Sequence, residues 1–467
     1  MPLKQFTTDF QEFTTHQHLR FDEKFWFTVK NLAVYNYVLL KDIFNLINGN
    51  SYTKYYTEEK TNIPYIRIGD LSFKYKINTH NLIYLDESCK INKEKKLKKD
   101  DLILATIGAT IGKINLAREF KDGTFSNNTI LLRLKDKEKH NPYFYEKLFQ
   151  SDLIQKYIWG VISQKAQPNL QSYDLENIKI PLILKSKQDQ IVTKIEPIER
   201  KIKELKGKII PVREIINKVF AREFKFDLKK FEELNKIKNY YLDLFSFGNN
   251  KDIRQSVKFH RETGYFVNNE LRKITNKKIK DFISEPIVLG KGVSPKDYDK
   301  SGDYYYVSMA NIKNWKFENK DSKLISKEYS SKNQNKTVLK NDILIARSGE
   351  GTIGKVALID DEDLQGIFAD FTMRVRLLDY NYLFAYYYFR TNYFQYLIEI
   401  NKKGLGNNTN IFPSQIQEFP MIDISLKNQQ KIVDEIKTEL DKQEDMNKKI
   451  ETEGSKINGI IEKAIAV

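Results

Sequence analysis

The stretch Leu97–Ala105 reads LKKDDLILA, and a close copy, LKNDILIA, returns at Leu339–Ala346. The first stretch is one residue longer, so the alignment has one residue of slack after Asp101. In both stretches a run of aliphatic residues follows an aspartate, which is typical of a buried strand that begins after a turn. The copies lie about 241 residues apart in a chain of 467 residues. This period indicates two copies of one large module rather than a solenoid of small repeats.

Further matches follow in the same order in both copies and at nearly the same offset. They pair Gly108 with Gly349, TIGK at 110–113 with TIGK at 352–355, 65–71 with 306–312, 123–125 with 366–368, 133–134 with 376–377, and 188–192 with 429–433. This ordered repetition predicts that the two modules share one fold.

Each copy divides into a globular part and a long helix. Short apolar segments between Gly, Asn and Asp turns predict strands, including 102–105 and 129–134. The predicted fold class is α+β, with two similar globular domains at 36–184 and 275–424. The remaining divisions are an N-terminal segment at 1–35, a central helix at 185–235, a connector at 236–274 and a C-terminal helix at 425–467.

Apolar residues at alternating spacings of three and four predict that the two helices form an antiparallel coiled coil within one chain. In the first helix these residues are Ile195, Ile198, Ile202, Leu205, Ile209, Val212, Ile216 and Val219. In the second helix they are Ile436, Leu440, Met446, Ile450, Ile457 and Ile460, with Gln443 at one heptad position. Pro211 should kink or break the first helix, whereas its counterpart Thr452 should leave the second intact.

Composition narrows the possible functions. The 78 Lys and Arg residues against 62 Asp and Glu residues give a net charge of +16, which favours a polyanionic partner, although coding bias toward Lys, Asn and Ile is an alternative cause. The single cysteine, Cys89, excludes an intramolecular disulfide framework and a cysteine-based zinc site, and His16 and His18 have no evident third metal ligand. Because no signal peptide is evident and no apolar run approaches the ~20 residues that span a bilayer, we expect a cytoplasmic chain without membrane contact.

Two motifs are similar to those of enzymes, but neither has the required context. GEGTIG at 349–354 fits a dinucleotide-binding pattern, yet it leads into a predicted strand rather than a helix. A β-turn that presents Lys113 and Lys355 toward phosphate is the better interpretation. NPYF at 141–144 lacks the second proline of an adenine methyltransferase loop, and a proline in the first turn of a helix explains it. We therefore expect no catalytic residues and no metal site.

With these features the chain resembles the specificity subunit of type I restriction–modification systems, and the resemblance covers nearly its whole length. It rests on the duplicated strand–turn blocks at 108–113 and 349–355, the strand ends IPL at 180–182 and FPM at 419–421, the Gln-x-x-Ile-Val-x-x-Ile helix starts at 188–195 and 429–436, and the lead-in RFD at 20–22 with a weaker echo, KFH, at 258–260.

The resemblance implies two target recognition domains, each of which reads one half of a bipartite site in double-stranded DNA. The antiparallel helical pair would hold these domains apart, set their spacing and bind two modification subunits, which methylate adenine at N6 with S-adenosylmethionine. Restriction subunits would join and use ATP and Mg²⁺ for translocation and cleavage. The chain itself would bind no cofactor and carry no catalysis, and its role would be bacterial or archaeal defence.

Polar and basic residues in the turns that link the shared strands are the candidates for DNA contact. In the first copy they are Arg67, Lys113, Asn127, Asn128, Lys165, Gln167 and Asn169. In the second copy they are Lys313, Asn314, Arg347, Ser348, Lys355, Lys403, Asn407, Asn408 and Asn410. Arg favours guanine and Asn or Gln favours adenine, while Lys more often contacts phosphate. Because Asn128 and Phe371 occupy matching positions, contacts should not transfer between copies.

Two other functions fit the same sequence. The chain could be a helical scaffold whose globular domains bind protein rather than DNA, and steep salt dependence of DNA binding would argue against this alternative. It could also be the recognition part of a split methyltransferase–nuclease. A neighbouring gene for a methyltransferase without its own recognition domain would favour the specificity subunit.

Overall fold

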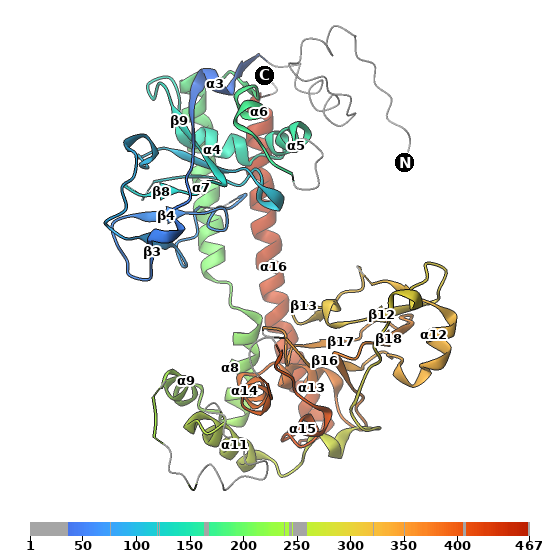
Figure 1. The fold of residues 1–467 in the computed structure, drawn as a ribbon. Helices are drawn as coiled ribbons and strands as arrows, with labels where there is room; N and C mark the ends of the chain where they lie inside the picture. Colours follow the sequence, from blue (N-terminus) through green and yellow to red (C-terminus); the bar gives the residue numbers. More distant parts are fainter. Residues whose placement is uncertain are drawn as a thin grey trace. The chain divides into compact units, whose positions relative to one another are not determined.

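The computed structural model describes residues 36–465 apart from residues 75, 119, 121, 163–167, 238, 242–244, 246–258, 321, 350 and 405–407. The chain divides into two compact units, and each is described by itself (Figure 1). Unit 1 comprises Met1–Lys208 and Asn447–Val467, and unit 2 comprises Ile209–Met446. The C-terminal helix α16 (Leu426–Ile465) therefore contributes residues to both units.

Unit 1 contains two four-stranded sheets, covered by helices on one side. Its elements are β1 (Tyr37–Leu39), α3 (Leu40–Ile43), β2 (Phe44–Asn48), β3 (Tyr56–Thr57), β4 (Pro64–Ile66), β5 (Ile83–Leu85), β6 (Leu102–Ala105), β7 (Ile114–Leu116), β8 (Thr124–Phe125), β9 (Thr129–Leu134), α4 (Pro142–Gln150), α5 (Asp152–Val161), α6 (Ser172–Glu176), β10 (Lys179–Pro181) and α7 (Lys185–Gly207). The strand orders are β2-β9-β6-β7 and β3-β5-β4-β8, and β1 pairs with β10.

The predicted strand 102–105 is β6, an inner strand of the first sheet. All four of its side chains are buried, because both faces of the sheet are covered. Leu102 and Leu104 pack in the core formed with α4 and α5. Ile103 and Ala105 pack in a second core with residues of the sheet β3-β5-β4-β8. The aliphatic run without polar alternation thus follows from burial on both faces.

Unit 2 repeats the first four-stranded sheet, but its second sheet has three strands. Its elements are α8 (Val212–Phe224), α9 (Leu228–Lys236), α11 (Glu262–Ile274), β11 (Val288–Leu289), β12 (Tyr304–Val307), β13 (Ile312–Lys313), β14 (Lys316–Phe317), β15 (Leu324–Ile325), α12 (Lys327–Lys332), β16 (Ile343–Ala346), β17 (Val356–Leu358), β18 (Gly366–Phe368), β19 (Thr372–Val375), α13 (Tyr382–Phe389), α14 (Asn392–Asn401) and α15 (Pro413–Ile416). The sheet β11-β19-β16-β17 corresponds to β2-β9-β6-β7, with β16 in the place of β6. The duplication predicted from sequence is therefore a duplication of topology.

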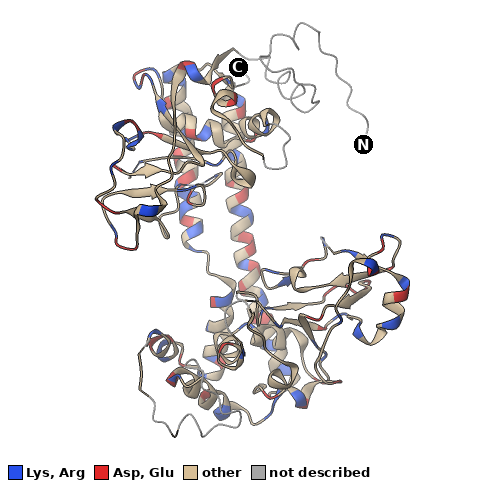
Figure 2. Cartoon of the chain, in the orientation of Figure 1, with Lys and Arg blue, Asp and Glu red and all other residues tan. Residues whose placement is uncertain are grey.

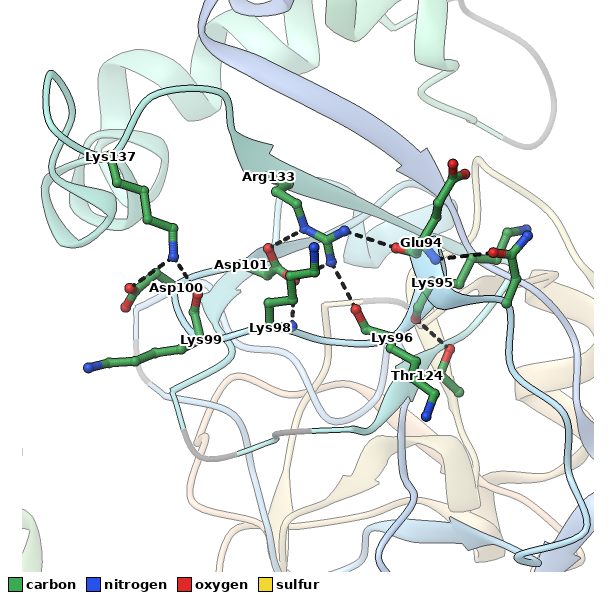
Figure 3. A network of polar contacts seen from close by, with 11 residues as sticks. Glu94, Lys95, Lys96, Lys98, Lys99, Asp100, Asp101, Thr124, Arg133 and Lys137 are labelled. Atoms are coloured by element: carbon green, nitrogen blue, oxygen red, sulfur yellow. Dashed lines mark hydrogen bonds and ion pairs between the residues drawn. The ribbon is translucent and has the colours of Figure 1, made fainter.

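An aspartate–arginine clamp closes one end of this sheet in both units. In unit 1, Arg133 Nε and Nη2 donate to Asp101 Oδ1 and Oδ2 at 2.9 and 2.7 Å, and the same guanidinium donates to the backbone carbonyls of Glu94 and Lys96 at 3.0 and 2.8 Å (Figure 3). In unit 2, Arg376 makes the corresponding bidentate contact with Asp342 at 2.8 and 2.7 Å. Bidentate pairs of this kind fix geometry as well as adding stability.

The clamp also corrects the alignment of the two copies. Asp101 and Asp342 are equivalent, and the residues before them, Asp100 and Asn341, both adopt a left-handed conformation with φ of 74° and 73°. The alignment of the two copies therefore needs no gap after Asp101. The extra residue of the second copy lies instead in the glycine turn that follows, where φ is positive at Gly349 and Gly351.

Asparagine and glutamine join each globular part to its helix in the same way. The Asn141 side chain accepts from the N–H groups of Tyr143 and Phe144 at 2.9 and 3.2 Å, so NPYF is a helix start with proline in the first turn. The buried Gln188 of α7 accepts from Asn141 N at 2.7 Å and donates to Ile183 O at 2.7 Å. Asn381 and Gln429 form the matching contact in unit 2 at 2.8 Å, which explains the glutamine at the start of both long helices.

The central segment 185–235, predicted as one helix, consists of three helices. Helix α7 ends at Gly207, α8 begins at Val212 with Pro211 at its N-cap, and α9 follows. The break predicted at Pro211 is therefore present, because proline cannot donate a backbone hydrogen bond inside a helix. The C-terminal helix α16 continues through Thr452 without a break, as predicted. The structure also keeps Pro197 inside α7, which the sequence analysis did not single out.

Both units contain an antiparallel helix pair. In unit 1, α7 packs on the last part of α16, with Lys201 Nζ 2.6 Å from Glu453 Oε1 and Ile195 in one core with Ile461 and Ile465. In unit 2, α8 packs on the first part of α16, where the buried Gln443 accepts from Ile210 N at 2.9 Å. The polar heptad position at Gln443 thus satisfies a backbone N–H that the helix break leaves without a helical partner.

The predicted packing residues fall into three groups. The buried members are Ile195, Ile202, Ile216, Val219, Ile436 and Ile450. The half-buried members are Ile198, Leu205, Ile209, Leu440, Met446, Ile457 and Ile460. Val212 is 39% exposed, so its assignment to the packed face is wrong, because the break at Pro211 restarts the helix in another register. Residues outside the predicted series, including Ile215, Phe220, Ile432 and Val433, fill the core instead.

We expect Arg133→Ala to lower the free energy of unfolding by about 2–4 kcal/mol, since it leaves the buried Asp101 carboxylate without its cation. Lys137 is the matched control, because it contacts Asp100 at 3.3 Å on the surface and its removal should cost less than about 1 kcal/mol. Urea denaturation of the full chain measures both. Equal effects of the two substitutions would contradict a structural role for the clamp.

The helix break generates a second stability prediction. Ile216→Ala should destabilise the chain by about 2–5 kcal/mol, because it opens a cavity in a closed core, whereas Val212→Ala should change stability by less than about 0.5 kcal/mol. Chemical denaturation of both variants tests this. A comparable loss of stability for Val212→Ala would indicate that Val212 belongs to the packed face of an uninterrupted helix. It would contradict the register described above.

Candidate nucleic-acid interface

Most of the described candidate residues of unit 1 gather at the end of the sheet opposite the clamp. Strand β6 ends at Ala105, and the next residue, Thr106, donates its N–H and hydroxyl to Asn128 O at 3.1 and 3.0 Å. Thr106 O accepts from Leu170 N at 2.8 Å, and Ile107 bridges to Asn169. Three segments that are distant in sequence, 106–113, 126–128 and 168–170, therefore meet as one loop cluster.

Unit 2 has the same loop cluster with different side chains. Arg347 follows β16, donates its N–H to Phe371 O at 2.9 Å, and accepts from Ile411 N at 3.0 Å. Ser348 bridges to Asn410, whose backbone pairs with that of Lys403 at 2.8 Å in both directions. The frame of backbone hydrogen bonds is thus shared between the units, but Thr106 corresponds to Arg347 and Asn128 to Phe371.

The glycine turns complete each loop cluster. Gly354 has φ of 78°, and a Cβ there would lie 2.8 Å from Ile398 of α14, so only glycine fits. The turn leads directly into strand β17 rather than a helix, as the sequence analysis predicted. Lys355 lies at its end, and its ammonium group makes no hydrogen bond or ion pair with the described part of the chain.

The guanidinium group of Arg347 lies over the ring of Phe412 at 5.2 Å from its centroid. Its Nε is buried and makes no hydrogen bond to the residues that the structure describes. An arginine held on an aromatic face has the planar geometry that suits a planar acceptor, such as the O6 and N7 edge of guanine.

The other predicted residues differ in how available they are. Arg67 is bound by its neighbours, with its guanidinium 3.4 Å from the Asp70 carboxylate and 3.3 Å from Asn81 O. Lys113 Nζ lies over the Phe73 ring at 5.8 Å. Ser348 is buried, and its hydroxyl donates to Thr409 O at 3.2 Å, which gives it a supporting role in the turn. Asn127 is exposed.

Three predicted residues, Lys165, Gln167 and Asn407, lie outside the described residues. Asn408 is exposed, and its carbonyl accepts from Asn410 Nδ2 at 3.1 Å. Lys313 and Asn314 lie apart from the Arg347 turn, in the β13–β14 hairpin that packs beside β17. The hairpin is fixed to α13 by the hydroxyl of Tyr386, which donates to Trp315 O.

Charged residues of both signs lie along the long helices. Figure 2 shows Lys and Arg interspersed with Asp and Glu along α7 and α16. Among the described residues, no group of three or more His, Cys, Asp and Glu side chains could hold a metal ion. No helix in the described part of the chain is long and apolar enough to cross a membrane.

Two modules with one backbone frame and different side chains in their turns form a duplicated recognition protein. The model of the type I restriction modification DNA specificity domain matches this chain twice, at residues 35–213 and 272–453. The chain therefore belongs to the type I restriction–modification DNA specificity family. Its role is DNA sequence specificity, and proteins of this family are non-catalytic.

The chain is also similar to solved structures. A chain from a study of complex assembly and conformational transition of the type I R-M system has 16% identity and a TM-score of 0.49, with 92% of this chain and 97% of that chain covered. The S subunit from M. genitalium has 14% identity and a TM-score of 0.40, with coverage of 92% and 96%. The HsdS subunit from Thermoanaerobacter tengcongensis has 14% identity and a TM-score of 0.31, with the same coverage. No curated protein sequence matches the chain.

Sequence reasoning missed two residues of the loop clusters. Thr106 is an ordinary small polar residue, and only the strand register shows that it corresponds to Arg347. Phe371 is 48% exposed, but an aromatic residue in a turn does not by itself indicate nucleic-acid binding. Its correspondence to Asn128 was the one signal available in the sequence.

Two substitutions in unit 2 separate phosphate contact from base contact. We expect Lys355→Ala to weaken binding to all DNA sequences and to lower the salt slope by about one. Arg347→Ala should instead cost about 1–3 kcal/mol at one base position. Binding to all single-base variants of the target at two salt concentrations measures both effects. A uniform loss across variants for Arg347→Ala would exclude base recognition by this residue.

Proposed function

We propose that each unit reads one half of a bipartite double-stranded DNA site through its loop cluster. The observation that carries this proposal is the contrast between frame and side chains. The backbone bonds of Thr106 to Asn128 and of Arg347 to Phe371 are equivalent, yet the side chains that they present differ in charge and polarity. Base edges in the major groove differ in donors, acceptors and methyl groups, so two unrelated half-sites need two different sets of side chains.

Features that repeat unchanged in both units suit a partner that binds twice. The Asn141–Gln188 and Asn381–Gln429 contacts give each unit the same junction between its globular part and its helix. Two copies of one modification subunit would then meet equivalent surfaces. In this proposal the helix pairs also set the spacing of the half-sites.

The chemistry would belong to the partner subunits. The modification subunits would methylate adenine at N6 with S-adenosylmethionine, and restriction subunits would use ATP and Mg²⁺ to translocate and cleave DNA. This chain would contribute specificity alone. A scaffold that binds only proteins is the alternative, and it predicts no sequence preference and no steep salt dependence of DNA binding.

Exchange of one globular domain tests the division of labour. Replacing residues 275–424 with the matching domain of another family member should change one half of the methylated target and leave the other half unchanged, since each frame carries its own side chains. Methylome sequencing of cells that carry the hybrid and its modification subunit measures this. A hybrid that altered both half-sites would overturn the proposal.

The purified chain gives a complementary prediction. It should transfer no methyl group to DNA when alone, and it should support transfer when the modification subunit is added. Incorporation of labelled methyl groups, with the modification subunit alone as control, measures both conditions. Methylation by the rigorously pure chain would contradict its assignment as the specificity subunit.

A further inference from the structure

The turn between β18 and β19 in unit 2 exposes an aromatic side chain in the middle of the loop cluster. Phe371 is 48% exposed, and its carbonyl accepts from Arg347 N at 2.9 Å. Among the described residues of 275–424, the other large apolar side chains of comparable exposure are Leu339 and Leu378. Leu339 lies beside the Asp342 clamp, and Leu378 follows the clamp residue Arg376 by two positions, at the opposite end of the sheet.

The surroundings of Phe371 are rigid. The next residue, Thr372, donates its N–H to Ala369 O at 3.0 Å and accepts from Gly290 N at 3.2 Å, while Lys291 N donates to Phe368 O at 3.0 Å. The preceding side chain, Asp370, lies against the neighbouring loop, since a Cβ on Gly292 would be 3.2 Å from Asp370 Oδ2.

That neighbouring loop is itself held by a tyrosine. Tyr329 Oη donates to Lys291 O and Gly292 O at 3.1 and 3.0 Å. Burial, with smaller contributions from the Asp297 and Asp370 carboxylates, raises the pKa of Tyr329 to about 12, so the hydroxyl keeps its proton at neutral pH. The backbone of the turn is therefore held in place, while the Phe371 side chain is exposed.

A comparison of Phe371 with its counterpart in unit 1 narrows the roles that its side chain can have. Unit 1 builds the same turn with Asn128, so the frame does not require an aromatic residue. Beside this turn, the guanidinium group of Arg347 lies over the Phe412 ring, and Arg347 N donates to Phe371 O. In the major groove the one apolar group among the base edges is the C5 methyl of thymine, and apolar side chains contact it.

On these grounds, and resting on the proposed function, we propose that Phe371 contacts the C5 methyl group of a thymine in the half-site that unit 2 reads. The half-site of unit 2 then contains at least one A·T pair whose thymine methyl contributes to affinity. Unit 1, with Asn128 in this position, makes no such contact from its matching turn.

Removal of the methyl group alone tests the proposal. The target is first defined by methylome sequencing, and the half-site of unit 2 by domain exchange. In duplexes of this target, each thymine of that half-site is then replaced singly by deoxyuridine, which keeps base pairing and removes the methyl. The full chain with its modification subunits should bind one of these duplexes about three- to fivefold more weakly than the unmodified target.

The substitution Phe371→Ala should remove this sensitivity. The variant should bind the unmodified target about as weakly as the normal protein binds the sensitive duplex, and deoxyuridine at that position should weaken it no further. Leu339→Ala is the matched control, because it alters an exposed apolar side chain at the opposite end of the unit 2 sheet. It should keep the deoxyuridine profile of the normal protein.

Two outcomes would overturn the proposal directly. They are a normal protein insensitive to every deoxyuridine and a Phe371→Ala variant that keeps the sensitivity. A variant that loses affinity equally for all DNA, with unstacking reported by 2-aminopurine in the normal complex, would make Phe371 a wedge between bases instead. Failure of the proposed function differs from all of these, because the complex would then discriminate at no position of the half-site.

Discussion

The backbone pairing of β6 with β9, and of β16 with β19, is the constraint on which each unit depends. In unit 1 the register runs from Leu102 opposite Leu132 to Ala105 opposite Thr129, and the hydrogen bond from Thr106 to Asn128 continues it beyond the strands. Because backbone atoms make these bonds, the side chains at the end of the sheet are not needed to hold the strands together. A fold of this kind keeps its frame while the exposed residues change.

The clamp at the other end of the sheet also holds the frame without using the side chains of the loop cluster. Asp101 and Arg133, like Asp342 and Arg376, are tied to each other in bidentate geometry, and the clamp arginine of unit 1 also binds the carbonyls of the preceding segment. These residues repeat in both copies because they hold the frame. At the opposite end of the sheet, Thr106 and Asn128 of unit 1 correspond to Arg347 and Phe371 of unit 2, and a recognition surface can vary there because backbone atoms make the bonds.

Much of the fold could be predicted from the sequence because the same sequence pattern occurs in both copies. The aliphatic runs predicted the inner strands at 102–105 and 129–134, since burial on both faces favours apolar side chains. Heptad spacing indicated the helix pair, and Pro211 its break, but the spacing could not show that the register restarts there and leaves Val212 exposed. The family match does not extend over α9.

The candidate interface was harder to predict, because it depends on pairing between distant segments. Asn128 and Asn169 are both turn residues in the sequence, and only the bonds to Thr106 and Ile107 bring them together. Ser348 was a candidate for DNA contact but is buried, whereas Phe371 was not a candidate but is exposed. Composition cannot make this distinction, since the same residue types serve in turns, cores and binding surfaces.

The central claim is that a shared frame presents two independent recognition surfaces, and hydrogen exchange in the DNA complex tests it most directly. Duplexes that contain only one correct half-site would be bound to the full chain with its modification subunits, and amide protection would be mapped. We predict protection of 106–113 and 126–129 with one duplex, and of 347–355 and 369–372 with the other. Protection of both sets by either half-site, or protection confined to the clamp ends of the sheets, would contradict the claim.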